Sequence, residues 1–142
     1  MQPVTDTFAR SYEADPTSVG RARAELARFA SRGGASQTQV DGLRLAVSEA
    51  VTNAVRHAYP LSSGEVRVRA RLGDDGLQVV VSDDGCGVHG DGADRDGLGF
   101  GLSLICEVSE QMTLAPRAGG GTDVRMRFSL SQSDSGVLVS RL

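Results

Sequence analysis

Hydrophobic residues recur along the first third of the chain at two different spacings. Residues 8–12 alternate weakly between apolar and polar side chains and predict a short opening strand. Over 16–31 the apolar residues recur every three or four positions, which predicts a helix that stops at Gly33-Gly34. A second helix is predicted over 37–58, ending there because the residue before Pro60 resists helical geometry.

The rest of the chain alternates in the manner of strands. Residues 66–70 and 77–81 flank a Gly-Asp-Asp-Gly turn and predict a hairpin. Residues 112–115 and 123–130 predict a second hairpin across the turn at 117–121. Between the hairpins, residues 83–101 contain seven glycines and predict the longest loop, with a third helix from about 100 to 110.

This order of elements predicts an α/β fold. We expect a two-layer sandwich in which a mixed, mostly antiparallel sheet is covered on one face by about three helices. The 142 residues suit one domain, which we expect to occupy residues 1–130, with a polar, frayed tail at 131–142.

The second predicted helix has two unlike faces. At about 100° per residue, one arc is apolar and should face the sheet; it consists of Val40, Leu43, Val47, Ala50, Val51, Ala54, Val55 and Ala58. The opposite arc carries an acid, an amide and cations at one-turn spacing: Glu49, Thr52, Asn53, Arg56 and His57. A solvated face is the usual meaning of such a row. Asn is a poor helix former with no cap to serve in mid-helix, and its presence favours a binding role.

Two glycine-rich segments lie in the long loop. Asp83 stands at a predicted strand end, and Gly85 and Gly87 after it would let a ligand approach the backbone. Such a carboxylate can accept a hydrogen bond from an exocyclic amine. The run Gly97-Leu98-Gly99-Phe100-Gly101 leads into the third predicted helix, whose free amides form a natural phosphate seat. Each segment alone is also compatible with a plain surface loop.

Composition and charge exclude several classes of protein. The fifteen basic residues are all arginine, they are scattered among eighteen acids, and the net charge is −3. A strong phosphate-backbone surface is therefore not expected, and nucleic acid is an unfavoured partner. Neither a membrane span nor a secretion signal is evident, so we expect a cytoplasmic protein with no membrane partner.

Taken together, the motifs resemble those of the GHKL ATPase superfamily, which has the Bergerat ATP-binding fold. The resemblance rests on four segments in a fixed order: the run from Glu49 through Asn53 to His57, the Asp83-x-Gly85-x-Gly87 box, the Gly97-x-Gly99 box and the Gly119-Gly120-Gly121-Thr122 turn. Within that superfamily, residues 48–59 are similar to the anti-sigma factor serine/threonine protein kinases.

The resemblance implies a role for each matching residue. Asn53 would hold Mg²⁺, Asp83 the adenine amine of ATP, and Glu49 would act as general base on a substrate serine. Arg95 would steady the departing phosphoryl charge, and Thr122 would support the adenine pocket. These roles suit phosphoryl transfer, which depends on positioning and charge neutralisation. The remaining nucleotide contacts implied are Arg56, His57, Gly85, Gly87, Gly97, Leu98, Gly99, Phe100 and Gly101.

The resemblance also implies partners. An anti-sigma kinase binds a sigma factor and phosphorylates an antagonist protein, and the family implies a homodimer. Two alternatives stay open. One is a sigma-binding module gated by nucleotide that transfers no phosphoryl group. The other is a detached catalytic domain of the histidine-kinase type, favoured by Gly101-Leu102-Ser103, which is closer to the histidine-kinase version of that motif.

Overall fold

The computed structural model describes residues 6–58, 64–74, 76–85, 109–117 and 120–129. Its described elements follow in the order β1 (Asp6–Glu13), α1 (Pro16–Arg32), α2 (Gln37–Asn53), the π-helical turn η1 (Ala54–Ala58), β2 (Glu65–Gly73), β3 (Gly76–Asp83), β4 (Gln111–Pro116) and β5 (Thr122–Phe128).

The five described strands form one sheet in the order β1-β2-β3-β5-β4. Both predicted hairpins are present, β2 with β3 and β4 with β5. All four neighbouring pairs are antiparallel, so the expectation of a mixed sheet is wrong for the described strands. The reason is that β1 and β5 join the first hairpin at its two edges, and each runs opposite to its neighbour. The predicted α/β class is confirmed.

Local capping explains where the two helices begin. The Asp15 side chain accepts a hydrogen bond from the Thr17 amide at 2.9 Å, and Pro16 occupies the first turn, where its missing N–H costs nothing. Ser36 and Gln39 form a reciprocal capping box, with hydrogen bonds of 3.1 and 2.8 Å. These caps satisfy amides that would otherwise lack partners, and they set the start of each helix at the residue predicted.

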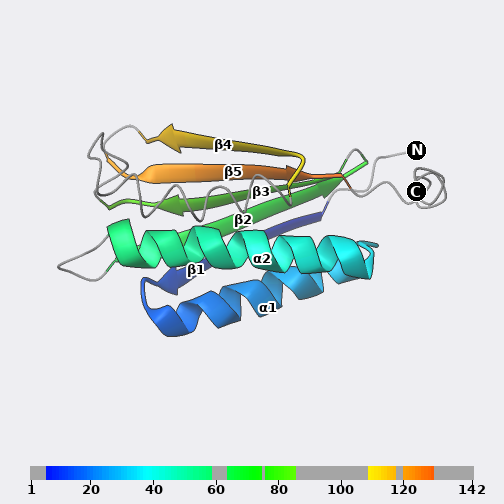
Figure 1. Ribbon diagram of the computed structural model, residues 1–142, viewed down its shortest axis with the longest axis horizontal. Coiled ribbons are helices and arrows are strands. Elements are labelled where there is room, and N and C mark those ends of the chain that lie inside the picture. The colour runs from blue at the N-terminus through cyan, green and yellow to red at the C-terminus, as the bar shows by residue number, and fades with distance from the viewer. Residues whose placement is uncertain (1–5, 59–63, 75, 86–108, 118–119, 130–142) are drawn as a thin grey trace.

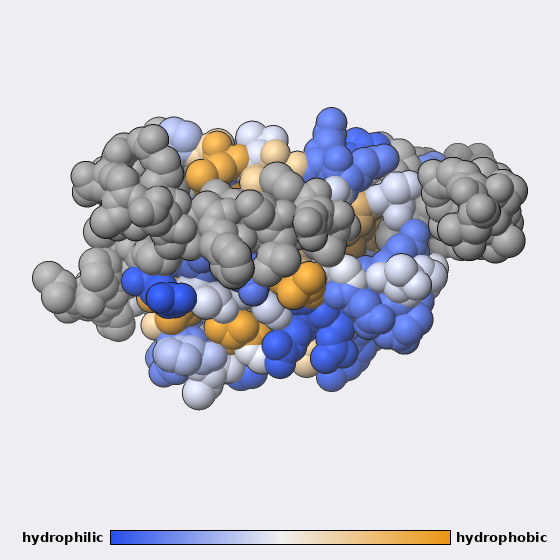
Figure 2. Space-filling model, viewed as in Figure 1, coloured by the Kyte–Doolittle hydropathy of each residue, from blue (hydrophilic) through white to orange (hydrophobic). Residues whose placement is uncertain are grey.

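The core lies between the sheet and the two helices, which cover the same face of the sheet (Figure 1). Alternate residues of β2 and β3, including Val66, Val68 and Val79, are fully buried in one core cluster with apolar residues of α1 and α2. Burying one such side chain contributes about 1.5–3 kcal/mol. The described part of the opposite, outward side of the helices is mainly hydrophilic (Figure 2), and Leu45 is its one exposed large apolar residue.

The second helix departs from the prediction at its end. The α-helix finishes at Asn53, and residues Ala54–Ala58 form a π-helical turn instead of a continued α-helix. A π turn contains more residues per turn than an α turn, so the 100° rule no longer gives the facing of residues beyond Asn53. Such turns are frequent at functional sites.

Several predictions lie outside the described residues. The third predicted helix has its residues 100–108 there, while Ser109 and Glu110 form a bend and not a helix. The glycine-rich loop beyond Gly85 and the tail at 131–142 also lie outside the described part. The division into residues 1–130 and 131–142 stays a prediction.

Candidate functional site

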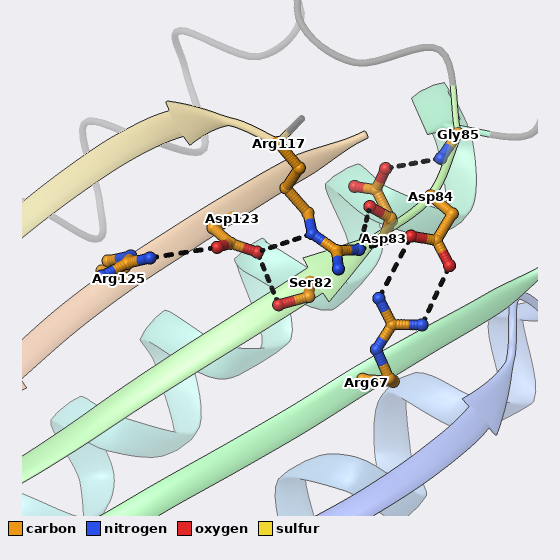
Figure 3. A network of polar contacts seen from close by, with 8 residues as sticks. All are labelled: Arg67, Ser82, Asp83, Asp84, Gly85, Arg117, Asp123 and Arg125. Atoms are coloured by element: carbon orange, nitrogen blue, oxygen red, sulfur yellow. Dashed lines mark hydrogen bonds and ion pairs between the residues drawn. The ribbon is translucent and has the colours of Figure 1, made fainter. Parts of the chain in front are cut away.

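Asp83 ends β3 and is a buried carboxylate. In the sheet it lies opposite Val66 of β2 and Thr122 of β5, on the side of the strand shared with the buried Val81. Only 7% of its surface is exposed. Its Oδ1 accepts a hydrogen bond from the Gly85 amide at 2.9 Å (Figure 3). The carboxylate that is predicted to bind adenine is therefore held in one orientation beneath the helix layer.

The surroundings of Asp83 make its charged form costly. Burial raises the pKa of the Asp83 carboxyl above its ordinary value, and the neighbouring Asp84 raises it further. The amides of Gly85 and Thr122 and the Arg117 guanidinium act in the opposite direction without cancelling the effect of burial. A ligand that donates a hydrogen bond to this carboxylate would offset part of that cost.

Thr122 faces Asp83 across the strand pair because Gly121 lets β3 and β5 come close. Gly121 has φ of +101°, and a Cβ at this position would overlap the Asp83 carbonyl oxygen and lie 2.8 Å from the Cα of Asp84. A residue with a side chain would push the start of β5 away from the end of β3. This glycine therefore sets the distance between the two predicted adenine-pocket residues.

Asn53 lies at the C-terminal end of α2, near the same end of the sheet. The ends of α2 and β3 and the start of β5 gather at the left of Figure 1, and η1 contacts β3. Asn53 is only 9% exposed, so it does not belong to a solvated helix face. Glu49, one turn earlier, is half-buried and forms no ion pair or hydrogen bond with another described residue. The sheet and helix ends bring Asn53 into a buried position that helix periodicity alone does not indicate.

Two buried polar atoms in the described part of the chain have no hydrogen-bond partner: Asn53 Nδ2 and Thr122 Oγ1. An unpaired buried polar atom costs about 1–3 kcal/mol, and such atoms are rare in native proteins. Both belong to residues that the sequence assigns to the Mg²⁺-nucleotide site. Buried polar atoms without partners are expected where a polar ligand binds, because the ligand supplies the missing hydrogen bonds.

The other predicted site residues divide into two groups. Arg56 is exposed on η1, and for His57 only the backbone position in η1 is described. Arg95 and the glycine-box residues lie outside the described part of the chain: Gly87, Gly97, Leu98, Gly99, Phe100 and Gly101. Their roles stay predictions.

A network of ion pairs holds the strand ends beside Asp83 (Figure 3). No motif in the sequence indicated this network. Arg67 of β2 forms a two-pronged contact with the Asp84 carboxylate, at 2.9 and 3.1 Å. Arg117, at the end of β4, pairs with the same carboxylate and donates to the Asp83 carbonyl oxygen at 3.2 Å. The hydrogen bond from Arg67 and the two positive charges hold the pKa of Asp84 below its usual value.

Asp123 of β5 extends the network across the sheet. It accepts a hydrogen bond from the Ser82 hydroxyl at 2.6 Å and lies 3.5 Å from Arg117 and 3.2 Å from Arg125. Burial alone would raise the pKa of Asp123, but the Ser82 hydrogen bond and the two arginines outweigh burial and lower the pKa. Ser82, Arg117 and Arg125 come from β3, the end of β4 and β5. The sequence alone could not show that they meet Asp123, because it does not give the pairing of the strands. The network ties β2, β3, β5 and the end of β4 together at the end of the sheet where Asp83 lies.

The described residues contain no group of three or more His, Cys, Asp or Glu side chains able to hold a metal ion. None of the helices in the described ranges is long and apolar enough to cross a membrane.

Comparison with known proteins identifies related sequences. The sequence model of the family described as histidine kinase-like ATPase domain matches residues 12–128. A serine-protein kinase RsbW from Bacillus licheniformis is 35% identical over 146 residues, which cover 99% of this chain and 86% of that protein. A serine-protein kinase RsbW from Staphylococcus epidermidis is 33% identical over 135 residues, 84% of this chain and 85% of that protein.

Solved structures share the fold. The crystal structure of RsbU and RsbW domains from Mycobacterium tuberculosis superposes with a TM-score of 0.71 at 24% identity, covering 89% of this chain and 33% of that chain. A blue-light activated histidine kinase from Erythrobacter litoralis superposes with a TM-score of 0.59 at 25% identity, covering 84% of this chain and 43% of that one. Both are similar in architecture.

Proposed function

The chain belongs to the histidine kinase-like ATPase domain family and, within it, to the RsbW serine-protein kinases, and from this premise we propose that it is an anti-sigma regulatory factor with kinase activity. It would transfer the γ-phosphoryl group of ATP to a serine or threonine of an antagonist protein. It would also sequester a sigma factor. We also propose that it acts in the cytoplasm as a homodimer, with residues 1–130 as the kinase domain.

The observation that carries the proposal is the pair of unpartnered buried atoms, Asn53 Nδ2 and Thr122 Oγ1, at the end of the sheet where Asp83 is buried. An amide nitrogen and oxygen exchange places when the amide turns over, so Asn53 can present an oxygen at the same position. An amide oxygen is a ligand that Mg²⁺ accepts, usually alongside phosphate oxygens and water. The residues present therefore fit a Mg²⁺-nucleotide complex.

In this proposal each residue acts through its position. Asp83 selects adenine by accepting a hydrogen bond from its amine, and Asn53 holds Mg²⁺, which neutralises phosphate charge when bound. Glu49 lies one helical turn before Asn53, so its half-buried carboxylate can take the proton of an incoming serine hydroxyl. Arg95 would neutralise charge on the departing phosphoryl group.

Glu49→Gln tests the kinase activity. Wild-type protein is incubated with radiolabelled ATP and the candidate antagonist, and label on the antagonist is measured. Glutamine keeps the size of the side chain but cannot accept the proton, so transfer should fall by about a hundredfold or more while ATP affinity stays the same or rises slightly. Glu13→Gln, an exposed position on β1, is the matched control and should transfer at the wild-type rate.

Two results would contradict parts of the proposal. If wild-type protein binds ATP and a sigma factor yet labels no antagonist, the chain is a nucleotide-gated binding module and not a kinase. If Glu49→Gln transfers at the wild-type rate, the kinase activity stands but another group is the base.

A further inference from the structure

The face of the sheet that α1 and α2 leave uncovered carries two rows of arginine. In the strand register, Arg69 of β2 lies opposite Val80 of β3, which lies opposite Arg125 of β5. Two residues along the strands, Arg71, Gln78 and Arg127 form the second row. We call this set the arginine face: Arg69, Arg71, Gln78, Val80, Arg125 and Arg127. No described helix lies over it (Figure 1).

The arginine face is hollowed and accessible. A depression of about 270 Å³ is lined by Arg69, Arg71, Gln78, Val80 and Arg125. A second depression of about 190 Å³ shares the β3 and β5 residues of the first and continues to Gln111 and Thr113 of β4. The two form a shallow track that crosses four strands. At about 4.8 Å per strand, the track is about 14 Å long, the length of roughly four extended residues.

Positive charge on this face is only partly neutralised. Arg125 pairs with Asp123 at 3.2 Å, and Arg127 pairs with Glu110 at 3.4 Å. Arg69 and Arg71 are exposed and form no ion pair with another described residue. The chain as a whole has a net charge of −3, so this concentration of arginine is not an average property of its surface. Exposed guanidinium groups of like charge repel one another, and a negative partner bound between them would relieve that repulsion.

We propose that the arginine face binds a short acidic segment of a protein partner, on the side of the sheet opposite to the nucleotide site. Val80 and Gln78 form an uncharged floor, and the arginines on β2 and β5 stand about 10 Å apart on either side of it. Guanidinium groups bind carboxylates through two parallel hydrogen bonds. A segment with two or more Asp or Glu residues would therefore meet an arginine on each side.

Two other occupants fit the arginine face less well. A second copy packed face to face would bring arginine rows against arginine rows, and like charges across an interface cost several kcal/mol. A nucleic acid is longer than the track, and its neighbouring phosphates would come near the carboxylate of Asp123, two residues along β5 from Arg125. A short acidic segment confined to the track avoids that carboxylate.

The test uses the full-length protein and a fluorescent decaglutamate peptide, with binding followed by fluorescence anisotropy. The double variant Arg69→Gln/Arg125→Gln should weaken binding at least about tenfold. The control Arg28→Gln/Arg44→Gln removes the same charge from exposed positions on α1 and α2 and should leave binding unchanged. Gln78→Glu, which keeps every arginine but places a negative charge on the floor, should also weaken binding.

Three results would overturn the proposal. Equal weakening in the sheet and helix variants would show that only net charge matters. Tighter binding of a single-stranded oligonucleotide than of the peptide, lost in the sheet variant, would assign the face to nucleic acid. The face would be assigned to a second copy by two results together: the wild type does not bind the peptide, and the sheet variant changes its oligomeric state in sedimentation runs. Circular dichroism on each variant establishes that it is folded.

Discussion

Arg117 donates a hydrogen bond to the main-chain carbonyl oxygen of Asp83, 3.2 Å away, and so ties the end of β4 to the residue proposed to select adenine. The same guanidinium pairs with Asp84 and lies 3.5 Å from Asp123. Arg117 does not contact the nucleotide in our proposal. It is a positioning residue, because it holds the Asp83 carbonyl and the side chain of Asp84 that follows it.

We predict that Arg117→Ala weakens ATP binding without unfolding the protein. Loss of hydrogen bonds to charged groups should cost about 1.5–3 kcal/mol of stability. ATP affinity should fall several-fold in calorimetry, because the Asp83 backbone loses its tether. Arg117→Lys should restore only part of the affinity, since one ammonium cannot reproduce the fork of a guanidinium. Unchanged affinity in the alanine variant would remove Arg117 from the positioning of the site.

Asp83→Asn should separate stability from binding. The pKa of Asp83 is raised in the folded state above its ordinary value of 3.8, so ionisation disfavours folding. The stability that this group contributes is full below the ordinary pKa and is lost as the pH rises through the raised value. Asparagine does not ionise. Urea unfolding without nucleotide should therefore favour the variant increasingly as the pH rises from the ordinary pKa of 3.8 through the raised value.

ATP affinity should move in the opposite direction in the same variant. A hydrogen bond to a charged group is worth about 1.5–3 kcal/mol, so Asp83→Asn should weaken ATP binding by at least about tenfold while GTP binding changes little. In the wild type, ATP binding should weaken as the pH falls through the raised pKa of Asp83. An ATP affinity loss below about 0.5 kcal/mol would place Asp83 outside the adenine pocket.

Asn53→Ala should remove metal-dependent binding at little cost to the fold. Its Nδ2 is buried without a partner, so deleting the amide removes an unsatisfied group worth about 1–3 kcal/mol and offsets the small cavity left behind. We expect a free energy of unfolding within about 1 kcal/mol of the wild type. The gain in ATP affinity that Mg²⁺ gives the wild type over EDTA should disappear. If that gain persists, Asn53 is not the metal ligand.

Gly121→Ala should damage both the fold and the site, whereas Gly20→Ala should not. At Gly121 an alanine Cβ overlaps the Asp83 carbonyl oxygen and φ is +101°, so we expect a loss of about 2 kcal/mol or more. At Gly20, inside α1, the added Cβ meets only the Arg23 guanidinium at 3.5 Å. There alanine should stabilise the helix by about 0.5–1 kcal/mol. Thermal unfolding of both variants checks the pair, and equal effects would contradict the close approach of β5 to β3.

The sequence by itself determined the local elements and their chemistry. The starts of α1 and α2, the alternation on β2 and β3, and the turn before Gly76 depend on neighbouring residues, so periodicity and turn chemistry were enough to predict them. The residue types proposed for the site were likewise evident, because their motifs are local runs of a few residues.

Only the tertiary structure decided which residues meet. The order β1-β2-β3-β5-β4, the burial of Asn53 and the ion pairs of Arg117 depend on contacts between segments far apart in the chain. The π turn after Asn53 was also beyond the sequence pattern, because α-helical periodicity assumes a constant number of residues per turn. The arginine face has the same origin, since alternate arginines on β2 and β5 come together only when β3 pairs between them.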